Sequence, residues 1–311
     1  MKKLNTKAKI YIAGHTGMVG SSLLRLFKKQ SFQNVILKKS SQLDLTNQYK
    51  TFNFLSREKP DYVIIAAAKV GGIKANNYKR AEFIYENLQI QNNLIHGSYI
   101  TGVKNLIFLG SSCIYPKITK QPIKEKYLLT SPLEYTNEPY AIAKIAGLKL
   151  CENYNFQYGT NFKCLMPCNL YGPNDNFDLE SSHFLPALLS KIYNAKINNQ
   201  SSVLLWGNGK TKREIMHVDD LAQACLHFLK IDTEHTLINI GSGEEYSINQ
   251  FANKISKFIG YKGKIIYNNE LIGTPRKIID SSIANKYGWI SKINFNRGFE
   301  SFYSYFKKQM K

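Results

Sequence analysis

The chain of 311 residues is 43% hydrophobic and 21% charged, an ordinary globular composition with enough length for one large α/β domain or two unequal ones. It has no apolar run near the ~18 residues of a membrane span, and the run after its basic start is too short for a signal peptide, so we expect a cytoplasmic protein without a membrane partner. The formal net charge of +20 would suit nucleic acid or anionic small molecules, but the lysines are spread over the whole chain, so we expect no nucleic-acid partner.

Apolar β-type runs alternate with longer amphipathic stretches in the first part of the chain, a pattern typical of a parallel sheet with crossover helices. Strands are expected at 9–14, 34–38, 61–68, 105–110 and 161–166, and helices at 18–30, 78–100 and 139–158. The predicted fold class is therefore α/β, with a Rossmann-type doubly wound parallel sheet in a first domain over residues 1–170.

Shorter elements and more loops follow, which predicts a smaller C-terminal lobe over residues 171–311. Helices are expected at 183–195 and 219–230, and strands at 202–206 and 236–241. One alternative is that some of these segments join the sheet of the first domain.

Three glycines, Gly14, Gly17 and Gly20, follow the first expected strand and open the first expected helix. Glycine there lets the backbone N–H groups and the helix N-terminus approach a dinucleotide pyrophosphate. Glycine turns also occur where a strand and a helix merely pack closely, but the strand–turn–helix context favours the nucleotide.

The end of the second expected strand distinguishes the two nicotinamide cofactors. An acidic residue there binds the ribose 2′-OH of NAD, whereas basic residues accommodate the 2′-phosphate of NADP. Lys38 and Lys39 stand at this end, and no carboxylate occurs before Asp44. The sequence therefore favours NADP(H).

Tyr140 and Lys144 lie four residues apart on one expected helix and so share a face. An ammonium group near a phenol lowers the pKa of the phenol and makes it a usable acid. Tyr303 and Lys307 repeat the spacing by chance. Since Ser111 follows the fourth strand, at the edge where open α/β sheets bind ligands, we take the first pair as catalytic and the second as structural.

Cys113, in the stretch "SSCIYP", has two interpretations: a core residue after a buried strand, or an acid/base group. The five cysteines form no C-x-x-C pair, their odd number argues against a disulfide framework, and the histidines lack ligand spacing. We therefore expect reduced thiols and no metal.

Several stretches together resemble the extended short-chain dehydrogenase/reductase family, among them "IAGHTGMVGS", "AAAKVGGI", "FLGSSCIYPK", "TNEPYAIAKIAG" and "REIMHVDD". The resemblance implies NADPH-dependent 3,5-epimerisation and 4-reduction of GDP-4-keto-6-deoxy-D-mannose to GDP-L-fucose, by a homodimer. An alternative is a related enzyme for another GDP-4-keto sugar of the colitose or 6-deoxy-heptose type. A second alternative is a non-catalytic dinucleotide-sensing or nucleic-acid-binding protein, which would not need Ser111, Tyr140 and Lys144 together.

The resemblance also implies the roles of individual residues. Ser111, Tyr140 and Lys144 would form the reductase triad, with Cys113 and His183 as the epimerisation acid/base pair, although a histidine such as His183 can also simply lie at a helix start. The implied cofactor site comprises Gly14, Thr16, Gly17, Met18, Val19, Gly20, Lys38, Lys39, Asp44, Ala66, Ala67, Ala68, Leu109, Gly110, Ser112, Pro167, Cys168, Asn169 and Leu170. The resemblance makes residues 1–170 the NADP-binding domain and residues 171–311 the substrate-binding lobe. The implied GDP-sugar site comprises Lys191, Trp206, Arg213, Lys264 and Lys277.

Three positions depart from the family pattern. Thr16, Lys191 and Lys264 stand where arginines are familiar. Lysine keeps the charge of arginine but lacks its planar fork, and threonine lacks both.

Overall fold

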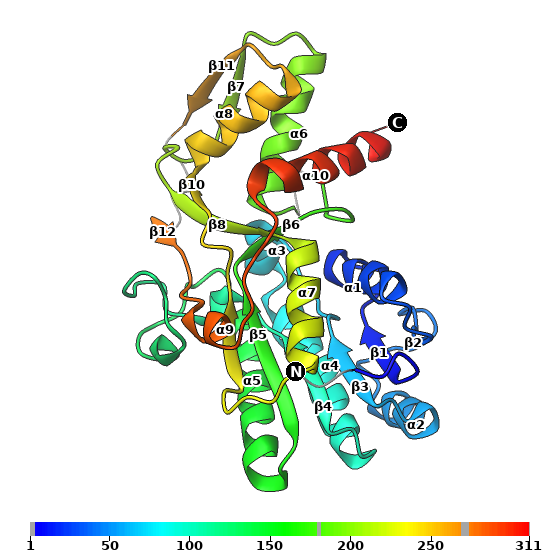
Figure 1. Ribbon diagram of the computed structural model, residues 1–311. Helices are drawn as coiled ribbons and strands as arrows, with labels where there is room; N and C mark the ends of the chain where they lie inside the picture. Colours follow the sequence, from blue (N-terminus) through cyan, green and yellow to red (C-terminus); the bar gives the residue numbers. More distant parts are fainter. Residues whose placement is uncertain (1–3, 179–181, 269–273, 311) are drawn as a thin grey trace.

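Six parallel strands form one sheet in the computed structural model, which describes residues 4–178, 182–268 and 274–310. The order across the sheet is β2-β1-β3-β4-β5-β9 (Figure 1). The strands are β1 (Lys9–Ala13), β2 (Asn34–Ile36), β3 (Tyr62–Ile65), β4 (Asn105–Leu109), β5 (Asn161–Pro167) and β9 (Leu237–Ile240). Their central residues are almost wholly apolar and buried, as expected for a parallel sheet that is covered on both faces.

Helices cover this sheet in two groups. α1 (Met18–Lys29) packs against α7 (Val218–Leu229), and α4 (Arg80–Ile100) packs against both α2 (Gln48–Glu58) and α5 (Glu138–Tyr158). The shorter elements are α3 (Ile73–Tyr78), α9 (Ser282–Lys286) and the 3-10 turns η1 (Ser112–Ile114) and η2 (Glu125–Tyr127). The first hydrophobic cluster lies between these layers.

A second hydrophobic cluster lies in the lobe drawn at the top of Figure 1. Its helices are α6 (Phe184–Ile197), α8 (Ile248–Ile259) and α10 (Phe295–Gln309), and its strands β7 (Ser202–Leu205) and β11 (Lys264–Tyr267) pair in parallel. Phenylalanines such as Phe251, Phe299 and Phe302 fill this core.

A small sheet connects the two lobes. Its central strand β8 (Lys212–His217) pairs with β6 (Asn169–Tyr171), β10 (Glu245–Ser247) and β12 (Arg276–Lys277). Because β6 directly follows β5, the carboxyl edge of the large sheet faces this junction (Figure 1).

The expected α/β fold is confirmed, with some differences of extent. β2 and β3 end earlier than expected, so that Lys38 and the alanines at 66–68 lie in loops. β9 and α7 come from the second half of the chain and join the first core. The domain division at residue 170 stays a prediction.

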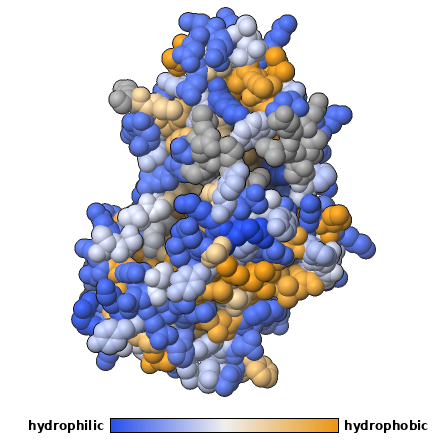
Figure 2. Space-filling model, turned by 180° about the vertical axis from the view of Figure 1, so that it is seen from behind, coloured by the Kyte–Doolittle hydropathy of each residue, from blue (hydrophilic) through white to orange (hydrophobic). Residues whose placement is uncertain are grey.

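On the face opposite that of Figure 1, hydrophilic residues cover most of the surface, and the apolar residues form separate patches on both lobes (Figure 2). Among the described residues, no helix is both long enough and apolar enough to cross a membrane.

Candidate active site

The loops at the carboxyl ends of four neighbouring strands meet at one edge of the large sheet. They follow β1, β3, β4 and β5 and contain most of the residues predicted for the cofactor. Parallel α/β sheets bind their ligands at this edge.

The structure explains the three glycines of the first loop in different ways. Gly14 has a φ of +84°, and a Cβ atom there would lie 2.6 Å from the nitrogen of Ala67. A Cβ atom on Gly20 would lie 2.1 Å from the oxygen of Gly14. Packing within the chain therefore requires glycine at both positions.

Gly17 has no such internal reason. A Cβ atom there would meet only the oxygen of Gly14, at an ordinary 3.6 Å, and the φ of −74° suits any residue. Gly17 is the N-cap of α1, and neither a capping side chain nor an acidic residue occupies this helix start. The free N–H groups and the missing side chain fit a dinucleotide phosphate.

His15 is a residue of this loop that the sequence reasoning passed over. Its Nδ1 atom is buried without a hydrogen-bond partner among the described residues. Burial and the charge of Lys39 lower the pKa of its imidazole, which indicates that Lys39 lies nearby. A lone histidine gives no signal in sequence, because only the fold shows that its ring nitrogen lacks a partner.

The other predicted cofactor residues lie around the same edge. Lys38 is half-buried, whereas Lys39, Thr16 and Asp44 are exposed. Asp44 accepts hydrogen bonds from the nitrogen and hydroxyl of Thr46, which lower the pKa of its carboxyl. The rest belong to the first turn of α1, to the ends of β3, β4 and β5 and the segments after them, and to η1 and β6: Met18, Val19, Ala66, Ala67, Ala68, Leu109, Gly110, Ser112, Pro167, Cys168, Asn169 and Leu170.

Ser111, Tyr140 and Lys144 are held by the end of β4 and the first turns of α5. The Ser111 hydroxyl accepts a hydrogen bond of 3.3 Å from the nitrogen of Cys113 and caps η1. Lys144 is 3% exposed, and its Nζ donates to the oxygen of Leu109 at 2.8 Å. This bond fixes the ammonium group beneath the carboxyl end of β4.

Lys144 and Tyr140 share one face of α5, with Nζ 5.6 Å from the centre of the phenol ring. Burial lowers the pKa of Lys144 to about 8. Burial and the charge of Cys113 raise the pKa of Tyr140, so its phenol keeps its proton at neutral pH. The expectation that Lys144 lowers this pKa is therefore wrong, because burial of the phenol dominates. The arrangement can therefore donate a proton from Tyr140.

Cys113 is half-buried beside this pair. Burial raises the pKa of its thiol, while the charges of Lys277 and Lys144 and a hydrogen bond with Ser111 lower it. Two ammonium groups from distant parts of the chain thus act on one sulfur atom. The structure brings Cys113, Tyr140, Lys144 and Lys277 together at one place.

Arg213 and Lys277 lie opposite each other in the β8–β12 pair. The Nη1 atom of Arg213 donates to the oxygens of Thr274, at 2.7 Å, and Lys212, at 2.8 Å. Burial lowers the pKa values of both Arg213 and Lys277, and the charge of Arg213 lowers that of Lys277 further. Paired cations beside a catalytic cluster are suited to a diphosphate.

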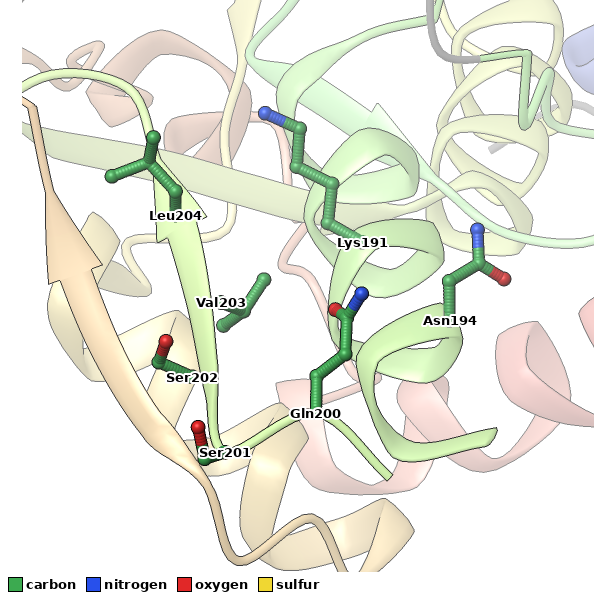
Figure 3. A pocket seen from close by; sticks show the side chains of 7 residues that line it. All are labelled: Lys191, Asn194, Gln200, Ser201, Ser202, Val203 and Leu204. Atoms are coloured by element: carbon green, nitrogen blue, oxygen red, sulfur yellow. The ribbon is translucent and has the colours of Figure 1, made fainter. Parts of the chain in front are cut away.

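The remaining predicted substrate residues gather around the second lobe. The Nζ of Lys191 lies 4.1 Å from the ring centre of Trp206. Lys264 pairs with Ser202 in the β7–β11 sheet. A pocket of about 630 Å³ lies between α6 and β7. Figure 3 shows Lys191 and Asn194 on its helix side. These residues form a second group, on other elements than Arg213 and Lys277.

His183 is the N-cap of α6 and its side chain is exposed, although the protein around the ring still lowers the pKa of the imidazole. It precedes the helix that carries Lys191 and belongs to the second lobe, whereas Cys113 belongs to the first. Its partnership with Cys113 stays a prediction.

Comparison with known proteins relates this arrangement to sugar-nucleotide enzymes. The chain is 50% identical to GDP-L-fucose synthase 1 of Arabidopsis thaliana over 97% of this chain and 94% of the relative. It is 44% identical to GDP-L-fucose synthase of Escherichia coli strain K12, over 97% of each chain. Among solved structures, a GDP-mannoheptose C4 reductase of Campylobacter jejuni with NADP bound is 39% identical, with a TM-score of 0.90, over 98% of this chain and 100% of that one.

The sequence model of the NAD dependent epimerase/dehydratase family matches residues 10–241, which span the glycine turn, the Ser111–Tyr140–Lys144 cluster and Arg213. This match and the two relatives show that the chain belongs to the NAD dependent epimerase/dehydratase family.

Proposed function

We propose that this chain converts GDP-4-keto-6-deoxy-D-mannose to GDP-L-fucose by epimerising C3 and C5 and reducing C4 with NADPH. The observation that carries the proposal is the single cluster of Ser111, Cys113, Tyr140 and Lys144, with Arg213 and Lys277 beside it. The printed names of the two relatives, both GDP-L-fucose synthases, support it.

The epimerisation step uses the acidity that the ketone gives to the hydrogens on C3 and C5. The carbanion left behind delocalises onto the ketone oxygen as an enolate, so each inversion needs one base and one acid on opposite faces of the sugar. In our proposal the Cys113 sulfur and the His183 imidazole hold and return these protons. A thiol and an imidazole have pKa values on either side of neutrality, which suits both directions of transfer.

The reduction step uses the second half of the cluster. NADPH, when bound, supplies the hydride for C4. Tyr140 then gives its phenolic proton to the ketone oxygen, which Ser111 orients by its hydroxyl. Lys144, fixed on the oxygen of Leu109, stabilises the phenolate that Tyr140 becomes.

The cofactor fits the chain's own residues. Gly17 and the uncapped start of α1 would hold the pyrophosphate, and Lys38 and Lys39 would hold the 2′-phosphate. The NADP in the structural relative supports this choice. We also propose that the protein is a homodimer and acts in the cytoplasm.

An assay of purified protein with NADPH and GDP-4-keto-6-deoxy-D-mannose tests the proposal. We expect stoichiometric NADPH oxidation and a product that matches authentic GDP-L-fucose by chromatography and NMR. A GDP-4-keto heptose is the comparison substrate, because Lys191 and Lys264 replace familiar arginines and the structural relative is a heptose reductase. Higher kcat/KM with the heptose would replace the proposed substrate by this alternative.

A further inference from the structure

Glu214 is a fully buried carboxylate in the middle of the sheet that joins the two lobes. Its side chain is 0% exposed, next to Arg213 on β8. One carboxylate oxygen accepts a hydrogen bond of 2.8 Å from the nitrogen of Gly243, and the other accepts one of 2.9 Å from the nitrogen of Ile279. One side chain therefore joins three separate segments of the chain.

The chain around Glu214 leaves space for its carboxylate to pack closely against the backbone. A Cβ atom on Gly241 would lie 2.4 Å from its oxygen, so the chain passes here without a side chain. Burial raises the pKa of Glu214 to about 7, and the nearby charge of Glu245 adds to the rise. A carboxylate is costly in such a place, which argues for a role beyond filling space.

Side chains of β8 make two of the hydrogen bonds that hold the segment carrying Lys277, beside the bonds of Ile278 with Gln121 and Ile123. At one end, Arg213 donates to the oxygen of Thr274; at the other end, Glu214 accepts from the nitrogen of Ile279. Adjacent side chains of a strand point to opposite faces of the sheet, so Arg213 and Glu214 of β8 hold this segment from opposite faces. Lys277 lies between the two anchors, opposite Arg213 and within electrostatic reach of Cys113.

We propose that Glu214 is a positioning residue that sets the place of Lys277 relative to Arg213 and Cys113, and through them the affinity for the GDP-sugar. The proposal rests on the proposed function, because it assigns the two cations to the substrate. Because Glu214 is 0% exposed, we assign it no contact of its own with the substrate. It acts through the backbone of residues 274–279.

The substitution Glu214→Gln tests this role, because glutamine has the same shape but offers an N–H₂ group to one of the two N–H donors. We expect the KM for the GDP-sugar to rise about tenfold while the Kd for NADPH stays within about twofold. A KM for the GDP-sugar equal to that of the wild type would overturn the proposal. If Glu214→Gln does not fold, Glu214→Asp, which keeps the charge but shortens the reach, takes its place.

Asp220→Asn is the matched control. Asp220 is also buried and also anchors a loop, since it accepts from the nitrogens of Lys292 and Ile293 and from the hydroxyl of Ser291. We expect this variant to lose thermal stability but to keep the wild-type KM. An equal rise of KM in both variants would mean that general destabilisation is the cause, and would overturn the positioning role.

Calorimetric titration with GDP separates this proposal from the proposed function. If the wild type binds GDP and Glu214→Gln binds it about tenfold more weakly, the positioning role stands even if the sugar is not the proposed one. Equal GDP affinities overturn the positioning role alone. Absence of GDP binding to the wild type overturns both.

Discussion

Opposing influences act on the pKa of the Cys113 thiol. Burial raises its pKa, whereas the ammonium groups of Lys277 and Lys144 lower it. A thiol held in this balance can both take and return a proton, provided that the two cations stay in place. Serine in the same position would have a far higher pKa.

We therefore expect Cys113→Ser to lose exchange of the sugar C3 and C5 hydrogens with solvent by at least about 100-fold, because general base catalysis commonly contributes that much. Deuterium incorporation into GDP-4-keto-6-deoxy-D-mannose, followed by mass spectrometry, measures this loss. Exchange at the wild-type rate would mean that Cys113 is a packing residue.

Tyr140→Phe is the reciprocal control in the same assay. It removes the proton donor for the ketone oxygen but leaves the sulfur of Cys113, so exchange should continue while NADPH oxidation stops. Loss of both activities in both variants would indicate a general structural defect.

Glu214 predicts how stability depends on pH. Burial raises its pKa from 4.5 to about 7, so the folded protein binds a proton there that the unfolded chain does not. This contribution is complete below the unfolded pKa and is lost as pH rises through the folded one. Thermal unfolding should show the wild type losing stability relative to Glu214→Gln between about pH 5 and about pH 8. A difference between the two proteins that is constant over this range would contradict the assignment.

The two Tyr-x-x-x-Lys pairs show how far a residue pattern can be interpreted. Lys307 lies 5.0 Å from the ring of Tyr303, and Lys144 lies 5.6 Å from the ring of Tyr140, so the local geometry is nearly the same. Tyr303 packs against the second hydrophobic cluster, whereas Tyr140 lies beside Cys113. Only the place in the fold, which the sequence order indicated, separates them.

At the scale of elements, we assign the choice between NADPH and NADH to the loop after β2. Lys38 and Lys39 follow this strand, and Asp44 is engaged with Thr46. We expect NADPH to bind at least about tenfold more tightly than NADH. Two lysines near the 2′-phosphate supply enough binding free energy for this difference. Fluorescence titration measures both affinities.

Lys39→Ala should weaken NADPH binding and leave NADH binding unchanged. Lys28→Ala, which removes an exposed lysine at the far end of α1, is the control and should change neither. Equal dissociation constants for the two cofactors in the wild type would contradict the assignment of NADPH.

The helix pair α4 and α5 presents apolar side chains to solvent. Phe156 is 92% exposed, and Ile142 lies about four turns before it on α5, close to the same face. Tyr85 and Ile100 are exposed on α4. Such surface on two packed helices favours a dimer through this pair.

Light scattering at micromolar concentration should therefore give twice the monomer mass of 35.6 kDa. Phe156→Glu should shift the protein toward monomer, whereas Ile118→Glu, at another exposed apolar residue in a loop, should not. The monomer mass for the wild type would contradict the prediction.

Elements with strong local patterns were predictable, and those defined by distant partners were not. The helix over Glu138–Tyr158 and the strand over Asn105–Leu109 agree closely with the expected ranges. The amphipathic helix α8 went unassigned although Ser247 and Gln250 form a capping box at its start. The pairing of β9 with β5, and of β12 with β8, depends on contacts between distant residues, which no local pattern encodes.

At the scale of the whole molecule, the proposed site lies at the junction between the lobes and draws on both halves of the chain. Cys113, Tyr140 and Lys144 come from the first half, and Arg213 and Lys277 come from the small sheet that the second half completes. The net charge of +20 suits two anionic ligands, a phosphorylated dinucleotide and a GDP-sugar.

The central claim is that one site both epimerises and reduces a GDP-4-keto sugar. The most direct test is the wild-type reaction with GDP-4-keto-6-deoxy-D-mannose and NADPH in deuterium oxide, followed by mass spectrometry and NMR of the product. We predict GDP-L-fucose with deuterium at both C3 and C5 and one NADPH oxidised for each product molecule. Oxidation of NADPH with no deuterium on carbon would reveal a reductase without epimerase activity and would contradict the claim.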